Sequence, residues 1–192
     1  MLRAFIAIPL PEALISQLGR MQRRLQRTCP DRCIRWVNPH TIHLTLFFIG
    51  DMPESRIAQI NQVLSLIAEP YPAFTLTVEN LGTFPNPKRP NVIWAGVKES
   101  EHKLADLVKA VNAGMAQSGF PPEQRKFTPH LTIGRVNRRT SREDSAAIGA
   151  EVARAAVGLL GTVAVTEMVL YRSILKNTGA EHTPLARYPL LK

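Results

Sequence analysis

The chain contains 192 residues, of which 45% are hydrophobic, and its 24 Lys and Arg against 15 Asp and Glu give a formal net charge of +9. This composition argues against a disordered chain, and the length suits one domain, or one domain with two similar lobes. A basic chain favours polyanionic partners such as nucleic acids, but charge alone specifies no sequence, and many such side chains only keep a surface solvated.

Other features of the whole chain exclude a membrane protein and a disulfide-rich protein. No apolar run reaches the roughly 18 residues that a membrane-spanning helix needs. The apolar N-terminal segment is too short, and too soon interrupted by Pro9, for a signal peptide. The two cysteines, Cys29 and Cys33, cannot form a disulfide framework and are interpreted as free thiols. We therefore expect a soluble, cytoplasmic protein. As a separate expectation, we take it to be a monomer.

The first half of the sequence alternates strand and helix patterns. Apolar residues two positions apart predict strands, and apolar residues three or four positions apart predict helices. On this basis we expect a strand over 3–8, a helix over 12–27, a short strand over 34–37, a strand over 42–49 stopped by Gly50, a helix from Pro53 and a strand over 74–81.

The second half repeats this order after a proline-rich loop at 84–91. The expected elements are a strand over 92–97, a helix over 101–118, a strand over 127–136, a helix over 142–156, a strand over 162–174 and a last strand over 182–190 without a counterpart in the first half. Repeated units of this kind usually pack about a pseudo-two-fold axis. The pattern therefore predicts one domain over 1–192 with an internal repeat, approximately 1–84 and 90–175, and a sheet in each half.

One short pattern occurs in both halves, as Thr-Ile-His-Leu-Thr-Leu at 41–46 and as Thr-Pro-His-Leu-Thr-Ile at 128–133. Successive side chains of a strand point to opposite faces, so the histidine and the second threonine of each copy share one face. These four residues are His43, Thr45, His130 and Thr132. If the two strands meet, they form a groove that presents two imidazoles and two hydroxyls.

Two histidines and two threonines suit acid–base chemistry on a phosphate without a metal or another cofactor. Because the unperturbed pKa of histidine is about 6.5, one ring can be neutral while its partner is protonated at neutral pH. His43 and His130 can therefore act as general acid and general base in a single step. The hydroxyls of Thr45 and Thr132 can donate hydrogen bonds to phosphoryl oxygens, although threonine also suits strands through its β-propensity alone.

The remaining histidines and cysteines are given a structural interpretation. Zinc sites are usually built from tightly spaced pairs of ligands. The four residues that lie nearest to such a pattern, without matching it, are Cys29, Cys33, His40 and His43. We therefore expect no metal site. The histidines interpreted as structural are His40, His102 and His182.

Basic residues near the second motif are candidates for phosphate binding. Arg135 lies five residues after His130, which on a regular strand places it on the opposite face. Gly134 could allow a bulge that returns this arginine to the side of the histidine as a phosphate clamp; otherwise it is a solvated charge. Lys88 and Arg89 lie in the 84–91 loop with its aromatic first residue, a combination that suits single-stranded nucleic acid.

The paired His-x-Thr-x motifs resemble those of the two-histidine (2H) phosphoesterase superfamily. Flanking segments narrow the resemblance to its bacterial and archaeal RNA 2′,3′-cyclic phosphodiesterases, also called 2′-5′ RNA ligases, and it covers nearly the whole chain. These segments are Arg-Ala-Phe-Ile-Ala-Ile at 3–8, Arg-Trp-Val at 35–37, His-Leu-Thr-Leu-Phe-Phe-Ile-Gly at 43–50, Phe-Pro at 84–85, Trp-Ala-Gly at 94–96, Phe-Thr-Pro-His-Leu-Thr-Ile-Gly-Arg at 127–135 and Leu-Tyr-Arg-Ser at 170–173.

The resemblance implies an α+β, bilobal, LigT-like 2H-phosphoesterase fold, in which two pseudo-symmetric lobes, each an antiparallel sheet flanked by helices, enclose an active-site groove. It implies a metal-independent enzyme without a cofactor that hydrolyses RNA 2′,3′-cyclic phosphate ends to 2′-phosphates. It also implies reversible joining of certain tRNA halves through a 2′-5′ bond, without ATP. By position, His43 would give a proton to the departing 3′ oxygen, His130 would activate water, and Thr45, Thr132 and Arg135 would hold the phosphate.

Two alternatives stay open at this point. The same fold can serve as a non-catalytic RNA- or nucleotide-binding module, or it can act on a small cyclic phosphate such as a nucleotide or an ADP-ribose derivative. The positive charge and the 84–91 loop favour RNA, but charge does not separate RNA from a dinucleotide. Where the family often has an aromatic residue after Gly-Ala, this chain has Glu181 and His182, so a contact from this edge is not predicted.

Overall fold

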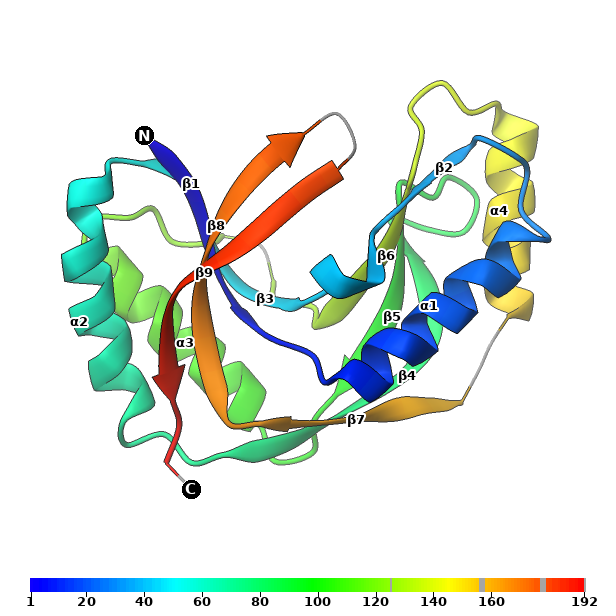
Figure 1. Ribbon diagram of the computed structural model, residues 1–192. Coiled ribbons are helices and arrows are strands. Elements are labelled where there is room, and N and C mark those ends of the chain that lie inside the picture. Colours follow the sequence, from blue (N-terminus) through cyan, green and yellow to red (C-terminus); the bar gives the residue numbers. More distant parts are fainter. Residues whose placement is uncertain (125, 156–157, 177–178, 192) are drawn as a thin grey trace.

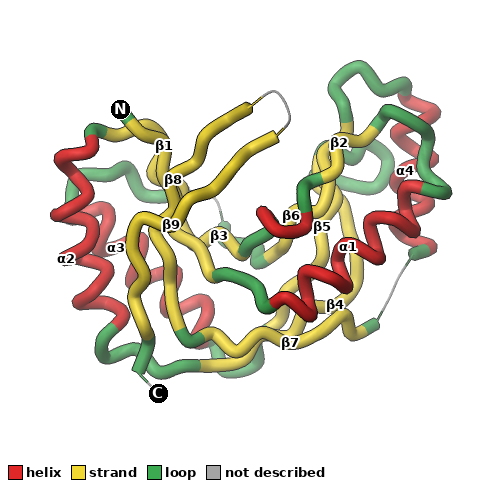
Figure 2. The backbone as a smooth tube through the Cα atoms, in the orientation of Figure 1, coloured by secondary structure: helices red, strands yellow, loops and turns green. Residues whose placement is uncertain are grey.

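The computed structural model describes residues 1–124, 126–155, 158–176 and 179–191. Two antiparallel sheets, each with helices packed against it, form two lobes that lie side by side (Figures 1 and 2). The fold is therefore α+β and bilobal, as the sequence predicts. Within the described ranges, no helix is long and apolar enough to cross a lipid bilayer.

The first lobe contains a four-stranded sheet in the order β3-β1-β8-β9. Helices α2 and α3 contact each other and pack against this sheet (Figure 1). The elements of this lobe are β1 (Leu2–Ile8), β3 (Leu44–Met52), α2 (Ile57–Ala68), α3 (Lys103–Gln117), β8 (Glu167–Lys176) and β9 (Gly179–Pro189), with short 3₁₀ helices η1 (Pro39–Thr41) before β3 and η2 (Glu54–Arg56) before α2.

The second lobe contains a five-stranded sheet in the order β2-β6-β5-β4-β7. Helix α1 packs on β7 and helix α4 on β4. The elements of this lobe are α1 (Glu12–Gln26), β2 (Ile34–Trp36), β4 (Phe74–Phe84), β5 (Val92–Lys98), β6 (His130–Val136), α4 (Arg142–Arg154) and β7 (Leu159–Val165).

Within the second lobe, helix α1 is joined to β6, the strand of the second histidine motif, by a buried side chain. Its apolar stripe buries Leu14, Leu18 and Leu25, at the spacing of a helix face that packs on a core. The same face buries Gln22, whose amide Nε2 donates to the backbone oxygens of Val37 (2.6 Å) and Ile133 (2.8 Å). This buried amide therefore joins α1 to the segment after β2 and to β6.

The expectation of one sheet in each sequence half is wrong. Each sheet combines strands from both halves: β1 pairs with β3 on one side and with the late strand β8 on the other, whereas β4 of the other sheet pairs with β5. The strand predicted over 162–174 is accordingly two strands, β7 and β8, which meet at Thr166 and belong to different sheets. The sequence does not signal this break, because no Gly or Pro interrupts the apolar pattern there.

The prediction that Gly50 stops its strand is also wrong. Strand β3 continues to Met52, and Gly50 has φ +80, which glycine adopts at little cost. Ala4 pairs with Gly50 and Phe5 with Phe48, so the glycine lies beside a bulge that bends the strand.

Other boundaries move by a few residues. The helix predicted over 101–118 covers Lys103–Gln117, the strand over 127–136 begins at His130, and the strand over 74–81 continues to Phe84. The strand expected over 182–190 is the longer β9. The helix predicted over 142–156 is α4, and Ala156, the last residue of that prediction, lies outside the described residues.

Candidate active site

The first histidine lies between η1 and β3, with its ring held on two sides. Its Nδ1 donates to the backbone oxygen of Thr41 at 2.8 Å, and the ring stacks on Phe5 with a centroid distance of 4.5 Å. Because a carbonyl oxygen can only accept, the proton of neutral His43 is on Nδ1, and Nε2 carries the free lone pair.

The second histidine repeats this arrangement at the start of β6. Its Nδ1 donates to the backbone oxygen of Thr128 at 2.7 Å, and the ring packs edge-on against Phe84 at 5.0 Å. The backbone acceptor is again the residue two positions earlier. His43 and His130 are therefore held in the same tautomer, and each offers Nε2 for proton transfer.

Both motif strands contain a bulge at the same position. In β6, Thr132 pairs with Trp94 and Gly134 with Ile93, so one residue of the motif has no partner on β5. In β3, Thr45 pairs with Ala7, and the next paired residue is again two positions on. The extra residues are Leu46 and Ile133, the fourth residue of each His-Leu-Thr-aliphatic motif. The shared bulge means that both strands bend in the same way after the threonine.

The bulge decides on which face Arg135 lies. The second-motif residues His130, Thr132 and Arg135 pair with β5 residues that are two positions apart and so share one face. These partners are Gly96, Trp94 and Val92. Arg135 therefore returns to the side of the histidine, as predicted for a strand with a bulge. Its side chain is exposed, while the threonine is half-buried.

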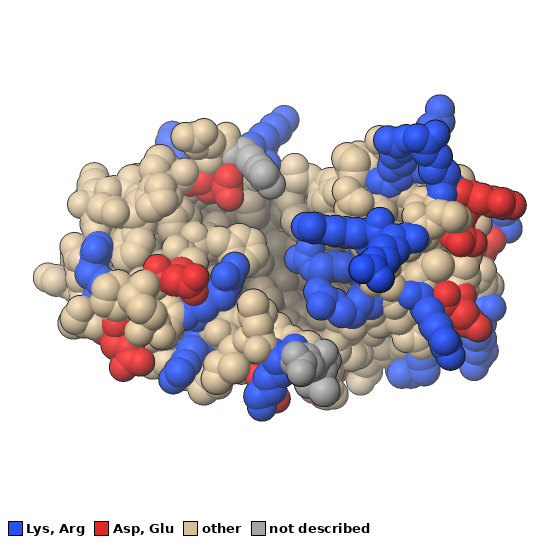
Figure 3. Space-filling view, turned by 90° about the horizontal axis from the view of Figure 1, so that it is seen from above, with Lys and Arg blue, Asp and Glu red and all other residues tan. Residues whose placement is uncertain are grey.

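The two motif strands lie where the lobes join. Strands β3 and β6 belong to different sheets but contact each other. Figure 3 shows a hollow between the lobes, with Lys and Arg side chains gathered on the wall formed by the second lobe. The predicted site residues of both motifs are thus carried by neighbouring strands.

The environment of His43 favours its neutral form. Burial lowers the pKa of His43 from 6.5 to about 4, the hydrogen bond to the Thr41 carbonyl acts in the opposite direction, and the nearby His182 lowers it further. At neutral pH the ring is therefore uncharged when no ligand is bound, with Nε2 ready to accept a proton.

The interpretation of His182 as a structural residue misses its position. This residue lies on β9, its ring is edge-on to that of His43 at 5.2 Å, and both line a cavity of about 120 Å³ together with Tyr171. Burial also lowers the pKa of His182. Sequence reasoning missed it because β9 has no counterpart in the first half and its pairing with β8 is a tertiary feature.

The other two histidines differ in their surroundings. His102 precedes α3 with a left-handed φ of +62. His40 is exposed, lies 3.9 Å from the carboxylate of Glu12 and forms part of the rim of the same cavity. Among the described residues, no three His, Cys, Asp or Glu side chains converge in a way that could hold a metal ion.

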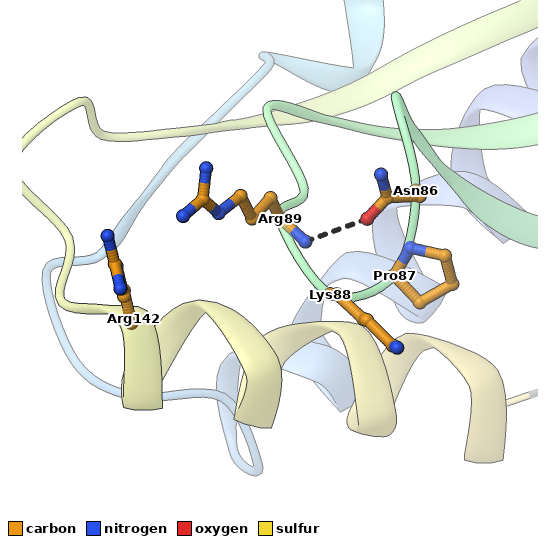
Figure 4. Close-up of a pocket in the computed structure, with 5 residues that line it drawn as sticks. All are labelled: Asn86, Pro87, Lys88, Arg89 and Arg142. Carbon is orange, nitrogen blue, oxygen red and sulfur yellow. Dashed lines mark hydrogen bonds between the residues drawn. The ribbon is translucent and has the colours of Figure 1, made fainter.

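The loop between β4 and β5 forms a separate basic pocket of about 450 Å³ (Figure 4). Arg89 from the loop and Arg142 from the start of α4 reach toward the same space, and Lys88 lies along the helix. The loop is held by a hydrogen bond from the Arg89 backbone N–H to the Asn86 side chain, at 3.0 Å. None of the three cations has a carboxylate within 4.0 Å in the part of the chain that the structure describes.

A glycine of α4 allows this loop to pack closely. A Cβ at Gly149 would lie 1.8 Å from the backbone oxygen of Pro87, so only glycine fits between helix and loop. The loop begins directly after Phe84, whose ring contacts His130. Asn86 lies two residues further, within about 8 Å of Phe84 along the chain. The basic pocket is therefore a neighbour of the second motif.

Comparison with known proteins gives a consistent result. The family model described as LigT like phosphoesterase matches residues 8–94 and 96–180. The RNA 2′,3′-cyclic phosphodiesterase of Methanothermobacter thermautotrophicus is 33% identical over 188 residues, covering 98% of each chain. The protein of that name from Escherichia coli is 30% identical, over 98% of this chain and 96% of its own. A crystal structure of E. coli LigT complexed with 3′-AMP superimposes with a TM-score of 0.74 at 25% identity, over 100% of this chain and 99% of that chain.

Proposed function

Since this chain belongs to the LigT-like phosphoesterase family, we propose that it hydrolyses 2′,3′-cyclic phosphate ends of RNA to 2′-phosphates. The observation that carries the proposal is the repeated histidine geometry. Two histidine rings, one directly before β3 and one at the start of β6, have Nδ1 tied to a backbone carbonyl, which leaves two Nε2 atoms for one donor and one acceptor role. The relatives named for this activity span nearly the whole chain.

The proposed step moves one proton at each side of the phosphorus. His130 Nε2 takes a proton from water, whose oxygen forms a new bond to phosphorus. The bond from phosphorus to the 3′ oxygen breaks, and His43 Nε2 gives that oxygen a proton. The hydroxyls of Thr45 and Thr132 and the guanidinium of Arg135 stabilise the charge that grows on the phosphoryl oxygens.

A bound phosphodiester reconciles the lowered pKa of His43 with an acid role, because the anion favours protonation of the ring by solvent. A phosphodiester anion beside Nε2 favours the imidazolium and raises the pKa. The acid is then loaded only when a phosphate is bound. His182, which lines the same cavity, lowers the pKa of His43 further through a coulombic interaction.

The same geometry supports ligation without ATP. An RNA 5′-hydroxyl in place of water would attack the cyclic phosphate, form a 2′-5′ diester and release the same 3′ oxygen. The strained ring supplies the driving force, so no activated nucleotide is needed. A non-catalytic binding module is the less favoured reading, because both motifs keep the histidine and the threonine that the reaction needs.

The proposal is tested with an oligoribonucleotide that ends in a 2′,3′-cyclic phosphate, in buffer with excess EDTA. We expect conversion to a 2′-monophosphate end, identified by phosphorus NMR. Absence of turnover, a 3′-monophosphate product, or activity that EDTA abolishes would each contradict it. A cyclic mononucleotide tested in parallel separates the two substrate classes: a higher kcat/KM for the mononucleotide would favour the small-substrate alternative.

The basic pocket supports RNA as the substrate rather than a mononucleotide. Lys88, Arg89 and Arg142, which have no carboxylate within 4.0 Å among the described residues, can neutralise phosphates of the strand that leads to the reacting end. We expect the double variant Lys88→Gln, Arg142→Gln to lower kcat/KM for the oligonucleotide about tenfold at low salt and to leave the cyclic mononucleotide unaffected.

The matched control for this variant removes the same charge elsewhere. Lys109→Gln with Arg20→Gln changes two exposed cations, one on α3 and one on α1, that do not line the pocket. An equal loss in both double variants would show that only net charge matters. A loss that extends to the mononucleotide would show that the loop supports His130 instead of binding RNA.

A further inference from the structure

The short edge strand β2 carries an exposed arginine beside the second histidine motif. Ile34 and Trp36, at the two ends of this strand, pack against the hydrophobic core. A Cβ on Gly134 of β6 would lie 3.1 Å from Ile34 and 3.2 Å from Trp36, so both side chains cover the glycine on the inner face of the sheet. Because successive side chains of a strand point to opposite faces, Arg35 points away from the core, and its side chain is exposed.

The strand register puts Arg35 on the face that carries the second motif. It lies directly opposite Arg135 in the pairing of β2 with β6. Residues opposite each other on neighbouring strands share a face, and their Cβ atoms are about 4.5–5.5 Å apart. Arg135 in turn shares its face with His130 and Thr132. Arg35 is therefore a second arginine on the same face, one strand further from β5.

Two arginines in this arrangement favour a bound anion. Like charges directly opposite each other on two strands destabilise a sheet. In the part of the chain that the structure describes, neither Arg35 nor Arg135 has a carboxylate within 4.0 Å that would offset the repulsion. Figure 3 shows that the second lobe gathers Lys and Arg side chains on its wall of the hollow. The pair is therefore suited to anionic groups of a ligand.

The reacting phosphate does not account for the second arginine. In the proposed reaction, Thr45, Thr132 and Arg135 already stabilise the charge on its oxygens. A nucleotide at the end of an RNA strand brings a further anion, which is the phosphodiester on the 5′ side of its ribose. A cyclic mononucleotide lacks this group, whereas every longer RNA has it.

We propose that Arg35 binds the phosphodiester that joins the last two nucleotides of the RNA, an inference that rests on the hydrolysis of cyclic phosphate ends proposed above. The smallest complete substrate is then a dinucleotide that ends in a 2′,3′-cyclic phosphate. A phosphate contact positions the strand and carries no base preference, because the phosphate is the same in every sequence. The contact therefore distinguishes an RNA end from a mononucleotide without selecting a base.

The test compares three substrates that share the reacting group. Adenosine 2′,3′-cyclic phosphate has no second phosphate, adenylyl-adenosine 2′,3′-cyclic phosphate has one, and the methylphosphonate analogue of this dinucleotide has the same linkage without its charge. We expect Arg35→Gln to lower kcat/KM about tenfold for the charged dinucleotide, mainly through KM, and by less than about twofold for the other two. Arg35→Lys, which keeps the charge, retains most of the activity on the charged dinucleotide.

Salt dependence gives a second measurement. Each phosphate of a single strand that a cation neutralises contributes about −0.7 to the slope of log affinity against log salt concentration. For the charged dinucleotide, the slope of log kcat/KM should therefore be shallower by about 0.7 in Arg35→Gln, and for the methylphosphonate it should not change. Arg20→Gln, which removes an exposed cation on α1, is the control and changes neither quantity.

The outcomes separate this inference from the function on which it rests. An equal loss on all three substrates would show that Arg35 holds the reacting phosphate or supports the fold, and full activity of Arg35→Gln on the charged dinucleotide would remove it from the site; either result overturns the inference alone.

Wild-type protein that turns over none of the three substrates overturns the function. In that case, equilibrium binding of adenylyl-adenosine 2′-phosphate decides the role of Arg35. Unchanged affinity in Arg35→Gln contradicts the contact. About tenfold weaker binding, with no loss for the methylphosphonate analogue, supports it.

Discussion

His43→Ala and His130→Ala are each expected to lower kcat/KM for a 2′,3′-cyclic phosphate by about 10²–10⁴-fold, because each removes one positioned proton-transfer group. The two losses should not add, since a reaction that lacks its acid gains little from keeping its base. The double variant is therefore expected to have about the same kcat/KM as the less active of the two single variants. Initial rates in EDTA, with saturating and limiting substrate, separate effects on kcat from effects on KM.

The pH profile gives this prediction a second measurement. The kcat/KM of the wild type should show a bell-shaped pH dependence, and each alanine variant should lose one of its two limbs. His102→Asn is the control, because this histidine does not line the cavity at His43 and asparagine tolerates its left-handed backbone. Undiminished turnover in either alanine variant, with a folded-state spectrum like that of wild type, would refute the paired roles.

The residues that the sequence placed well are those governed by local rules. The alternation of a strand predicted that His130 and Thr132 share a face, and Gly134 pointed to the bulge that brings Arg135 to the same side. The matching bulge at Leu46 had no such signal, because no glycine lies beside it. It becomes visible only when β3 is paired with β1.

The features that the sequence could not predict depend on which strands become neighbours. The apolar pattern over 162–174 is the same whether the segment belongs to one sheet or to two. The sequence therefore does not predict that the chain passes from one sheet to the other at Thr166. His182 approaches His43 only because β9 pairs with β8, which pairs with β1. The internal repeat over 1–84 and 90–175 stays a prediction, and the matched bulges and Nδ1 hydrogen bonds are what supports it.

The last prediction concerns the stability that His43 contributes. Its pKa is about 4 in the folded protein, against about 6.5 for a free histidine. Between these values the unfolded chain binds a proton that the folded chain does not, so unfolding takes up a proton and stability rises with pH. The contribution of His43 to the free energy of unfolding should therefore be fully present above about pH 6.5. It should fall by up to about 3 kcal/mol as the pH drops through 4, because each pKa unit corresponds to about 1.4 kcal/mol.

Urea denaturation of wild type and His43→Phe across this pH range isolates the contribution of His43 to stability. Phenylalanine keeps a ring that can stack on Phe5. The carboxylates and His182 titrate in both proteins, so their contributions cancel in the difference. The difference between the two stability curves should follow the titration of one proton; parallel curves would contradict it. Saturating inorganic phosphate should abolish most of this difference, since an anion that raises the pKa of His43 must itself bind more tightly to the protonated ring. If phosphate stabilises both proteins equally at every pH, the anion does not load His43 with the proton that the leaving 3′ oxygen needs, and the acid role would have to belong to His130.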